Sequence, residues 1–160
     1  MSRTTLALVL GVLITPAAPL DEKAKPDPEQ LQGTWKFVRL SLFGNEPPKE
    51  FLPKVRVVIE GKTFTIKPGI VFEGSNEKPD GEWKLGAKDG DSVTIELDPS
   101  KKPKTIDLTT EFDGQKMTLH GIYQLDGDDL KICFGQQRPK EFPGKVDSGT
   151  VLYVLKRDKK

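Results

Sequence analysis

Residues 117–134 read MTLHGIYQLDGDDLKICF, and in this stretch apolar and polar side chains alternate on both sides of an Asp-Gly pair. The apolar positions are Met117, Leu119, Tyr123 and Leu125 before the pair and Leu130, Ile132 and Phe134 after it. Alternation with a period of two is typical of a strand with one buried face, and Asp-Gly favours a tight hairpin turn because glycine accepts positive φ. The stretch therefore predicts an antiparallel hairpin with one face in the core.

The same alternation recurs along the chain from residue 33 onward. It predicts about nine strands, at residues 33–42, 55–60, 63–67, 82–85, 93–97, 106–109, 117–125, 130–134 and 151–155. Further Asp-Gly pairs and one Gly-Lys pair indicate short turns, and no stretch has the pattern of a long amphipathic helix. Sequential hairpins tend to close on themselves because closure removes sheet edges. The sequence therefore predicts an all-β fold, an up-and-down antiparallel β-barrel of eight or nine strands, with a two-sheet β-sandwich as the alternative.

The first 30 residues do not share this pattern. Residues 1–17 combine a positive charge at Arg3, a nine-residue apolar run and a small-residue end, which is the plan of a cleaved secretory signal peptide. Residues 18–30 are polar and contain prolines, so they predict a flexible lead, and residues 31–160 form the predicted barrel domain. We therefore expect an exported protein, periplasmic or secreted, without a transmembrane span.

The composition excludes several function classes. The 160 residues hold 25 Lys and Arg against 24 Asp and Glu, so the formal net charge is +1 and lacks the basic surplus of a nucleic-acid-binding protein. One cysteine cannot form an intramolecular disulfide, and one cysteine with one histidine cannot supply a usual zinc site. We expect no metal, no cofactor and no nucleic-acid partner.

Side chains that could carry catalysis are few. His120 lies in mid-strand on the outward parity, which favours a solvent-facing histidine over a member of a Ser-His-Asp site. Cys133 shares the outward parity with Lys131, and a small, partly buried apolar residue is favoured over a reactive thiol. Because no catalytic constellation results, the sequence predicts a protein that is not an enzyme.

Polar clusters in the turns favour structural roles. The acidic turn at residues 126–129 lacks the downstream glutamate of a calcium loop, which favours a solvated hairpin turn. The basic run at residues 101–104 indicates a charged turn in preference to a contact with a phosphate or an anionic polymer. The segment RPKEF at residues 138–142 is expected to pin the loop before the last strand, with Phe142 capping an open barrel end, in preference to recognising a ligand.

The strand positions that are expected to face the barrel interior carry almost no polar side chains. An enzyme that acts on a polar substrate inside the barrel would need converging polar groups there. The interior is therefore either a packed core or a cavity for a small apolar ligand. The candidate ligand-lining residues are Phe64, Trp83, Tyr123 and Phe134.

Gly33-Thr34-Trp35 opens the first predicted strand and resembles the Gly-x-Trp start of lipocalins and related calycin barrels. In that group the tryptophan closes the barrel base against a basic residue near the last strand. The resemblance assigns this role to Trp35 with Arg157 or Lys156, and it makes Gly33, Trp35 and Arg157 a structural signature.

Longer segments point to a narrower group. They are LQGTWK at 31–36, LDP at 97–99, KPKTIDL at 102–108, GIYQLDGD at 121–128, LKICF at 130–134, RP at 138–139 and LKR at 155–157. Together they are similar to a family of small exported proteins, abundant in planctomycete bacteria, that share a lipocalin-like domain of unknown function. The resemblance implies the barrel and no known activity, so it provides no catalytic residue.

Two functions stay open on the sequence. The favoured one is an exported lipocalin-like domain that holds a small apolar ligand inside the barrel, since barrels with this entry motif commonly host ligands. The other is a protein-interaction, structural or inhibitory module that acts through its loops, such as residues 44–53 and 69–80. An internal apolar cavity of about 300 Å³ or more favours the first function, and a filled interior with an exposed apolar patch favours the second.

Overall fold

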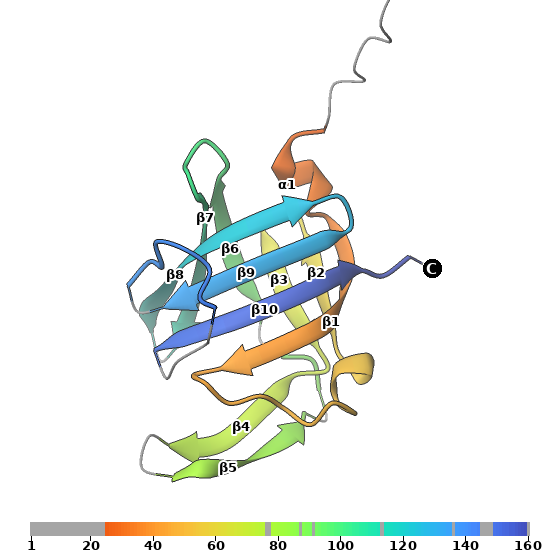
Figure 1. The fold of residues 1–160 in the computed structure, drawn as a ribbon, viewed down its shortest axis with the longest axis vertical. Helices are drawn as coiled ribbons and strands as arrows, with labels where there is room; N and C mark the ends of the chain where they lie inside the picture. The colour runs from red at the N-terminus through yellow and green to blue at the C-terminus, as the bar shows by residue number, and fades with distance from the viewer. Residues whose placement is uncertain are drawn as a thin grey trace, which may run out of the picture.

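The alternating strands close into an eight-stranded antiparallel β-barrel, and a two-stranded hairpin stands beside it (Figure 1). The computed structural model describes residues 25–75, 78–86, 88–90, 92–112, 114–135, 137–144 and 149–159. The elements are α1 (Asp27–Gln30), β1 (Gly33–Leu42), η1 (Leu52–Lys54), β2 (Arg56–Glu60), β3 (Thr63–Lys67), β4 (Ile70–Ser75), β5 (Lys78–Leu85), β6 (Val93–Asp98), β7 (Lys104–Phe112), β8 (Gln115–Asp126), β9 (Asp129–Gly135) and β10 (Thr150–Arg157). Around the barrel the order is β1-β10-β9-β8-β7-β6-β3-β2, which confirms the predicted barrel.

The turn chemistry explains how neighbouring strands are joined. The hairpin predicted at residues 117–134 is present as β8 and β9, and Gly127 in its turn has a φ of 57°. Gly61 and Gly114 serve the β2–β3 and β7–β8 turns with φ values of 60° and 73°. Each of these conformations favours glycine because the left-handed region strains other residues. The pair Asp80-Gly81 lies within β5 instead of in a turn.

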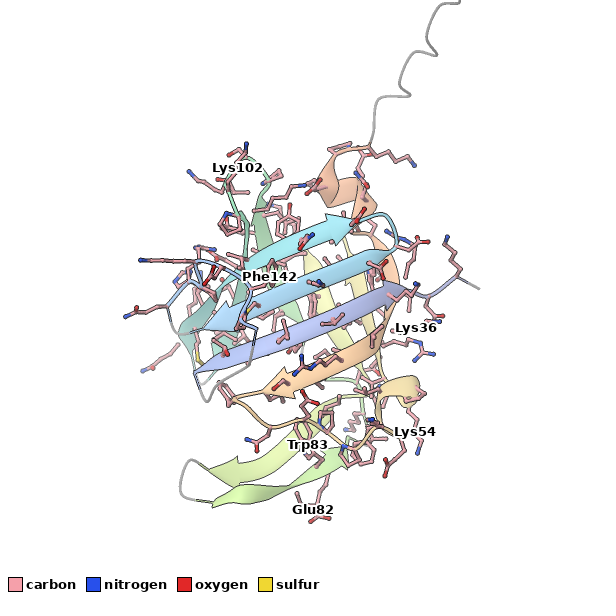
Figure 2. All side chains as sticks on the ribbon, viewed as in Figure 1. Lys36, Lys54, Glu82, Trp83, Lys102 and Phe142 are labelled. Carbon is pink, nitrogen blue, oxygen red and sulfur yellow. The ribbon has the colours of Figure 1, made fainter. Side chains whose placement is uncertain are left out.

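The β4–β5 hairpin corrects two predictions. β4 occupies much of the stretch 69–80 that the sequence predicts as a loop, and it pairs with β5 outside the barrel. Trp83 on β5 is consequently not a residue of the barrel wall. Its half-buried side chain points from β5 toward the barrel and packs against the core (Figure 2). Alternation cannot distinguish the two cases, because a barrel strand and a strand of an inserted hairpin both bury one face.

Aromatic rings meet across the interior of the barrel. Tyr153 on β10 contacts Phe37 on β1 and Phe134 on β9, with ring centroids 5.4 Å and 5.7 Å apart. Its ring also stacks at 6.2 Å on Phe64 of β3, which is not a neighbour of β10 in the barrel. Burial raises the pKa of the Tyr153 hydroxyl to about 12. At this level, therefore, side chains from facing walls fill the interior.

Trp35 closes the barrel end beside α1. The indole nitrogen of this fully buried residue donates a hydrogen bond to the Leu31 carbonyl at 2.9 Å, and the Arg157 guanidinium lies 4.2 Å from its ring centroid. Arg157 also donates to the carbonyls of Gln30 and Gln32. Arg157, rather than the lysine before it, thus covers the tryptophan and ties the entry of β1 to the end of β10.

The lead before the barrel has more structure than its composition predicts. Asp27 in α1 accepts hydrogen bonds from Lys104 at 2.6 Å and from the Tyr123 hydroxyl at 2.8 Å. Burial raises the pKa of the Asp27 carboxyl, but these hydrogen bonds outweigh burial and leave the pKa below its usual value. Within the lead predicted as flexible at residues 18–30, Asp27–Gln30 thus form a helix that partners on β7 and β8 hold.

The predicted signal peptide at residues 1–17 lies outside the described residues and stays a prediction. No helix in the described part of the chain is both long enough and apolar enough to cross a membrane.

Candidate functional site

A second apolar cluster lies outside the barrel. Ile122, Cys133 and Leu152 are buried cross-strand neighbours on the outer face of β8, β9 and β10. The loop at residues 137–144 crosses this face, and Phe142 packs on the cluster (Figure 2). Phe142 therefore covers the barrel wall, and the prediction that it caps an open barrel end is wrong. The alternation of residues along the strands correctly predicts that these three side chains point out of the barrel. It does not predict which outward-facing residues a loop will cover.

Arg138 fastens this loop to the barrel wall. Its guanidinium donates to the Gly121 carbonyl at 2.6 Å and to the Asp107 carboxylate at 2.9 Å, and the ring of His120 lies 3.3 Å from the same carboxylate. Burial raises the pKa of Asp107, but hydrogen bonds from Arg138 and His120 outweigh burial and leave the pKa below its usual value. A guanidinium nitrogen of Arg138 also lies 3.5 Å from Nδ1 of His120. The arrangement accordingly holds the loop against the barrel wall.

We expect Arg138→Ala to expose Cys133 to thiol reagents. Cys133 is 0% exposed beneath the loop, and the substitution removes two hydrogen bonds that hold this loop. The rate of labelling by an aromatic disulfide reagent under native conditions should rise about tenfold or more, because local opening becomes easier. The control is Arg39→Ala, which removes an exposed ion pair with Glu46 and should leave the rate unchanged. Equal labelling of Arg138→Ala and the parent protein would show that Arg138 does not keep the loop closed.

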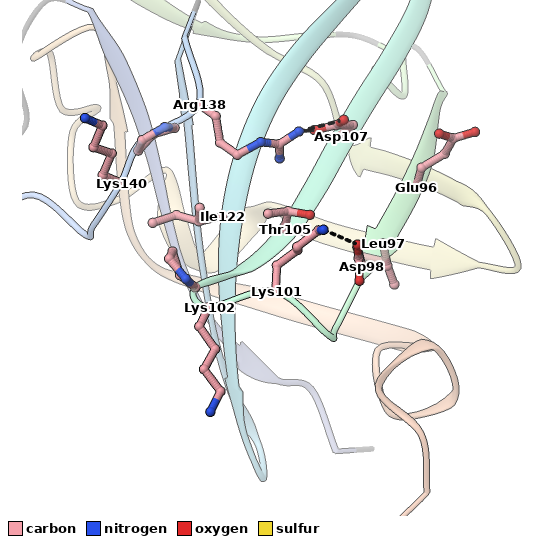
Figure 3. Close-up of a pocket in the computed structure, with 12 residues that line it drawn as sticks. Glu96, Leu97, Asp98, Lys101, Lys102, Thr105, Asp107, Ile122, Arg138 and Lys140 are labelled. Atoms are coloured by element: carbon pink, nitrogen blue, oxygen red, sulfur yellow. Dashed lines mark hydrogen bonds and ion pairs between the residues drawn. The ribbon is translucent and has the colours of Figure 1, made fainter.

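Two cavities flank the loop where it approaches the turn between β6 and β7. The polar cavity, of about 640 Å³, lies over the outer side of β6, β7 and β8 (Figure 3). It is lined by Glu96, Leu97, Asp98, Lys101, Lys102, Pro103, Thr105, Asp107, Ile122, Arg138, Pro139 and Lys140. The apolar cavity, of about 460 Å³, is lined by Pro99, Lys101, Lys102, Pro103, Lys104, Tyr123, Gln124, Leu125, Lys140, Glu141 and Phe142. The two cavities together are named the groove.

Lys101, Lys102, Pro103 and Lys140 line both cavities and form the border between them. Lys101 lies 3.9 Å from the exposed Asp98, a type of pair that contributes little. Lys102 and Lys140 are exposed and form no ion pair with any residue that the structure describes. Positive charge at the border is therefore available to a ligand.

The apolar cavity combines an apolar lining with a cationic rim. Its apolar lining consists of Pro99, Pro103, Tyr123, Leu125 and Phe142. Lys104 is neutralised by Asp27, 2.6 Å away, so Lys102 and Lys140 are the lysines of this lining without a described ion-pair partner. Glu141 is the one carboxylate among the lining residues of this cavity that the structure describes. Such a surface suits a ligand with an apolar body and a negatively charged group.

The structure brings the four predicted ligand-lining residues to the core and leaves one of them at the groove. Phe64, Tyr123 and Phe134 belong to the buried core, and Trp83 packs against it from β5. Tyr123 also lines the apolar cavity. The walls of the groove come instead from the basic run and the RPKEF segment, for which structural roles were favoured. No local pattern shows that these two segments meet, and the unbalanced basic run was the only signal. Within the described ranges, no group of three or more carboxylate, imidazole or thiol side chains could hold a metal ion.

The contact of Arg157 with Trp35 agrees with the resemblance stated above, but a shared geometry of this kind does not assign a family. The lipocalin-like family and its exported location therefore stay predictions. A scan against protein-family models, a search of curated proteins and a search of solved structures each found no match to this chain.

Proposed function

We propose that the protein is an exported binding protein that holds an anionic amphipathic ligand in the groove outside its barrel. The observation that carries this proposal is the position of Lys102 and Lys140, two lysines without a described ion-pair partner at the rim of an apolar cavity. The volume of about 460 Å³ is typical of a small-molecule site.

Charge and burial both support this class of ligand. An anionic group beside the border lysines gains more from their charge than it would in open solvent, because the cavity wall displaces part of the screening water. Covering the apolar lining contributes about 25 cal/mol for each Å² removed from water. A ligand with an apolar body and an anionic group makes both gains, whereas a purely apolar or purely ionic ligand makes one.

The groove takes the place of the barrel interior as the preferred site. The rings of Phe37, Phe64, Phe134 and Tyr153 occupy the interior, so an internal ligand would have to displace buried aromatic side chains. Binding of an apolar ligand inside the barrel and the lack of an enzymatic activity stay predictions from the sequence.

Fluorescence titration with anilinonaphthalene sulfonate tests this function, since that probe joins an aromatic body to an anionic group. At low ionic strength, the double substitution Lys102→Glu/Lys140→Glu should raise the Kd by about tenfold or more, which is about 1.4 kcal/mol of binding free energy. The matched control is Lys36→Glu/Lys54→Glu, which makes the same charge change at exposed positions away from the groove (Figure 2). The control should bind the probe as the parent protein does. Equal loss in both variants, or loss in neither, would contradict the proposed site.

A further inference from the structure

We infer that the groove binds an extended peptide segment. In this arrangement an apolar side chain of the peptide fills the apolar cavity, an acidic neighbour meets Lys102 or Lys140, and the following residues lie in the polar cavity. The inference rests on the proposed function of the groove and names the chemical class of its ligand.

The shared border makes the two cavities one path. Lys101, Lys102, Pro103 and Lys140 line both, so a chain anchored against Phe142 passes the border lysines directly into the polar cavity. A ligand confined to the apolar cavity would leave the adjoining polar cavity of about 640 Å³ empty. The continuity of the groove therefore favours a ligand with several units in sequence.

The charges of the polar cavity argue against a polyanion. Its lining includes the carboxylates of Glu96, Asp98 and Asp107, and Asp107 already engages Arg138 at 2.9 Å (Figure 3). A nucleic acid or another polymer with a negative charge on every unit would meet these carboxylates without enough free cations to balance them. A peptide backbone carries no net charge and offers a hydrogen-bond donor and acceptor at each residue, which mixed polar walls can satisfy.

The border accounts for the acidic residue of the peptide. Lys102 and Lys140 line both cavities and have no described partner, so a carboxylate placed beside either lysine gains a cation without breaking an existing pair. The two side chains point apart in Figure 3, so each lysine offers its own position for an acidic group. Because these lysines are exposed, the attraction should weaken as salt is added. The apolar anchor supplies the part of the affinity that salt does not remove.

Thr105 gives a way to block the polar cavity alone. This residue on β7 pairs across the strands with Ile122 on β8, and both line the polar cavity but not the apolar one. A larger side chain at Thr105 therefore fills the polar cavity without altering the border lysines. Thr118 on β8 is exposed and lines neither cavity, so Thr118→Tyr is the matched control for Thr105→Tyr.

The experiment compares two synthetic acetylated peptides and anilinonaphthalene sulfonate by calorimetry and fluorescence. The short peptide is a phenylalanine followed by two aspartates, and the long peptide adds five uncharged polar residues. We expect the long peptide to bind the parent protein about tenfold more tightly than the short one. Thr105→Tyr should abolish this difference and leave the short peptide and the probe unaffected, whereas Thr118→Tyr should change nothing. Glu96→Tyr, at an exposed position on another strand of the polar cavity, is a second blocking variant if Thr105→Tyr does not fold.

The outcomes separate the two proposals. Equal affinity of the two peptides, or a long-peptide advantage that survives both blocking variants, would overturn the peptide inference while the binding site for an anionic amphipathic ligand stands. Probe binding that ignores Lys102→Glu/Lys140→Glu would overturn the proposed function itself, and the inference would fall with it. A long-peptide advantage that the blocking variants remove supports both.

Discussion

Trp35→Ala should lower the free energy of unfolding by about 3–5 kcal/mol, the range measured when a buried aromatic side chain is removed. Trp35 is 0% exposed, and the substitution deletes the hydrogen bond to Leu31 and the surface on which the Arg157 guanidinium lies. A loss of this size is a large part of the 5–15 kcal/mol that typically stabilises a domain of about this size. Urea unfolding followed by far-ultraviolet circular dichroism measures the effect without relying on tryptophan emission.

Two further variants divide this loss into parts. Trp35→Phe retains an aromatic ring in the barrel end and should lose less than the alanine variant. Arg157→Leu removes the cation–π contact, which contributes roughly 0.5–2 kcal/mol, together with the hydrogen bonds to Gln30 and Gln32. A loss below about 1 kcal/mol in Trp35→Ala is the range of surface substitutions and would refute a structural role for this end of the barrel.

Gly121→Ala should destabilise the barrel by about 1–3 kcal/mol, as overpacking of a filled core does. A Cβ atom at Gly121 would lie 2.5 Å from Cδ1 of Phe134 and 2.9 Å from the carbonyl oxygen of Cys133. Phe134 is the cross-strand partner of Gly121, and its ring occupies the space that a side chain would need. The sign of the stability change is diagnostic, because replacing glycine with alanine often stabilises a protein by about 0.4–1 kcal/mol where the backbone permits it.

Gly144→Ala is the matched control, since a Cβ atom at Gly144 would meet nothing within 4 Å. It should be neutral or slightly stabilising in the same urea titrations. Adding Phe134→Leu to Gly121→Ala should recover part of the loss caused by the clash, in a double-mutant cycle that measures the coupling of the two positions. Equal stabilities for Gly121→Ala and Gly144→Ala would show that the Phe134 ring moves aside without a cost in folding free energy.

Alternation predicts the barrel well where apolar and polar residues follow each other with a period of two. In residues 117–134 the apolar and polar positions alternate and the Asp-Gly turn lies between them, so both strands and their register follow from local sequence. In β4 the apolar residues Ile70, Val71 and Phe72 are consecutive. That run has no period of two, and the strand was predicted as a loop. The position of β4 beside the barrel depends on contacts that no local pattern records.

The groove could be predicted only in pieces. The basic run and the RPKEF segment are both visible in the sequence, yet each alone has an ordinary structural interpretation. They form one site because Arg138 reaches Asp107 and Gly121, residues 31 and 17 positions away along the chain. Composition and periodicity describe neighbours in the sequence, whereas this site is made by neighbours across the sheet.

The pairing of β1 with β10 has a consequence for how the chain reaches this structure. The hydrogen bond from Arg157 to Gln32 joins residues 125 positions apart. Closure of the barrel therefore requires the first and last strands to come into contact. Closing so long a loop has an entropic cost that must be met before the contact stabilises anything, and proteins dominated by such distant pairings fold in about milliseconds to seconds. The barrel therefore cannot close until β10 has been synthesised and can pair with β1. An exported chain, as we propose this one to be, therefore stays open until its last strand is made.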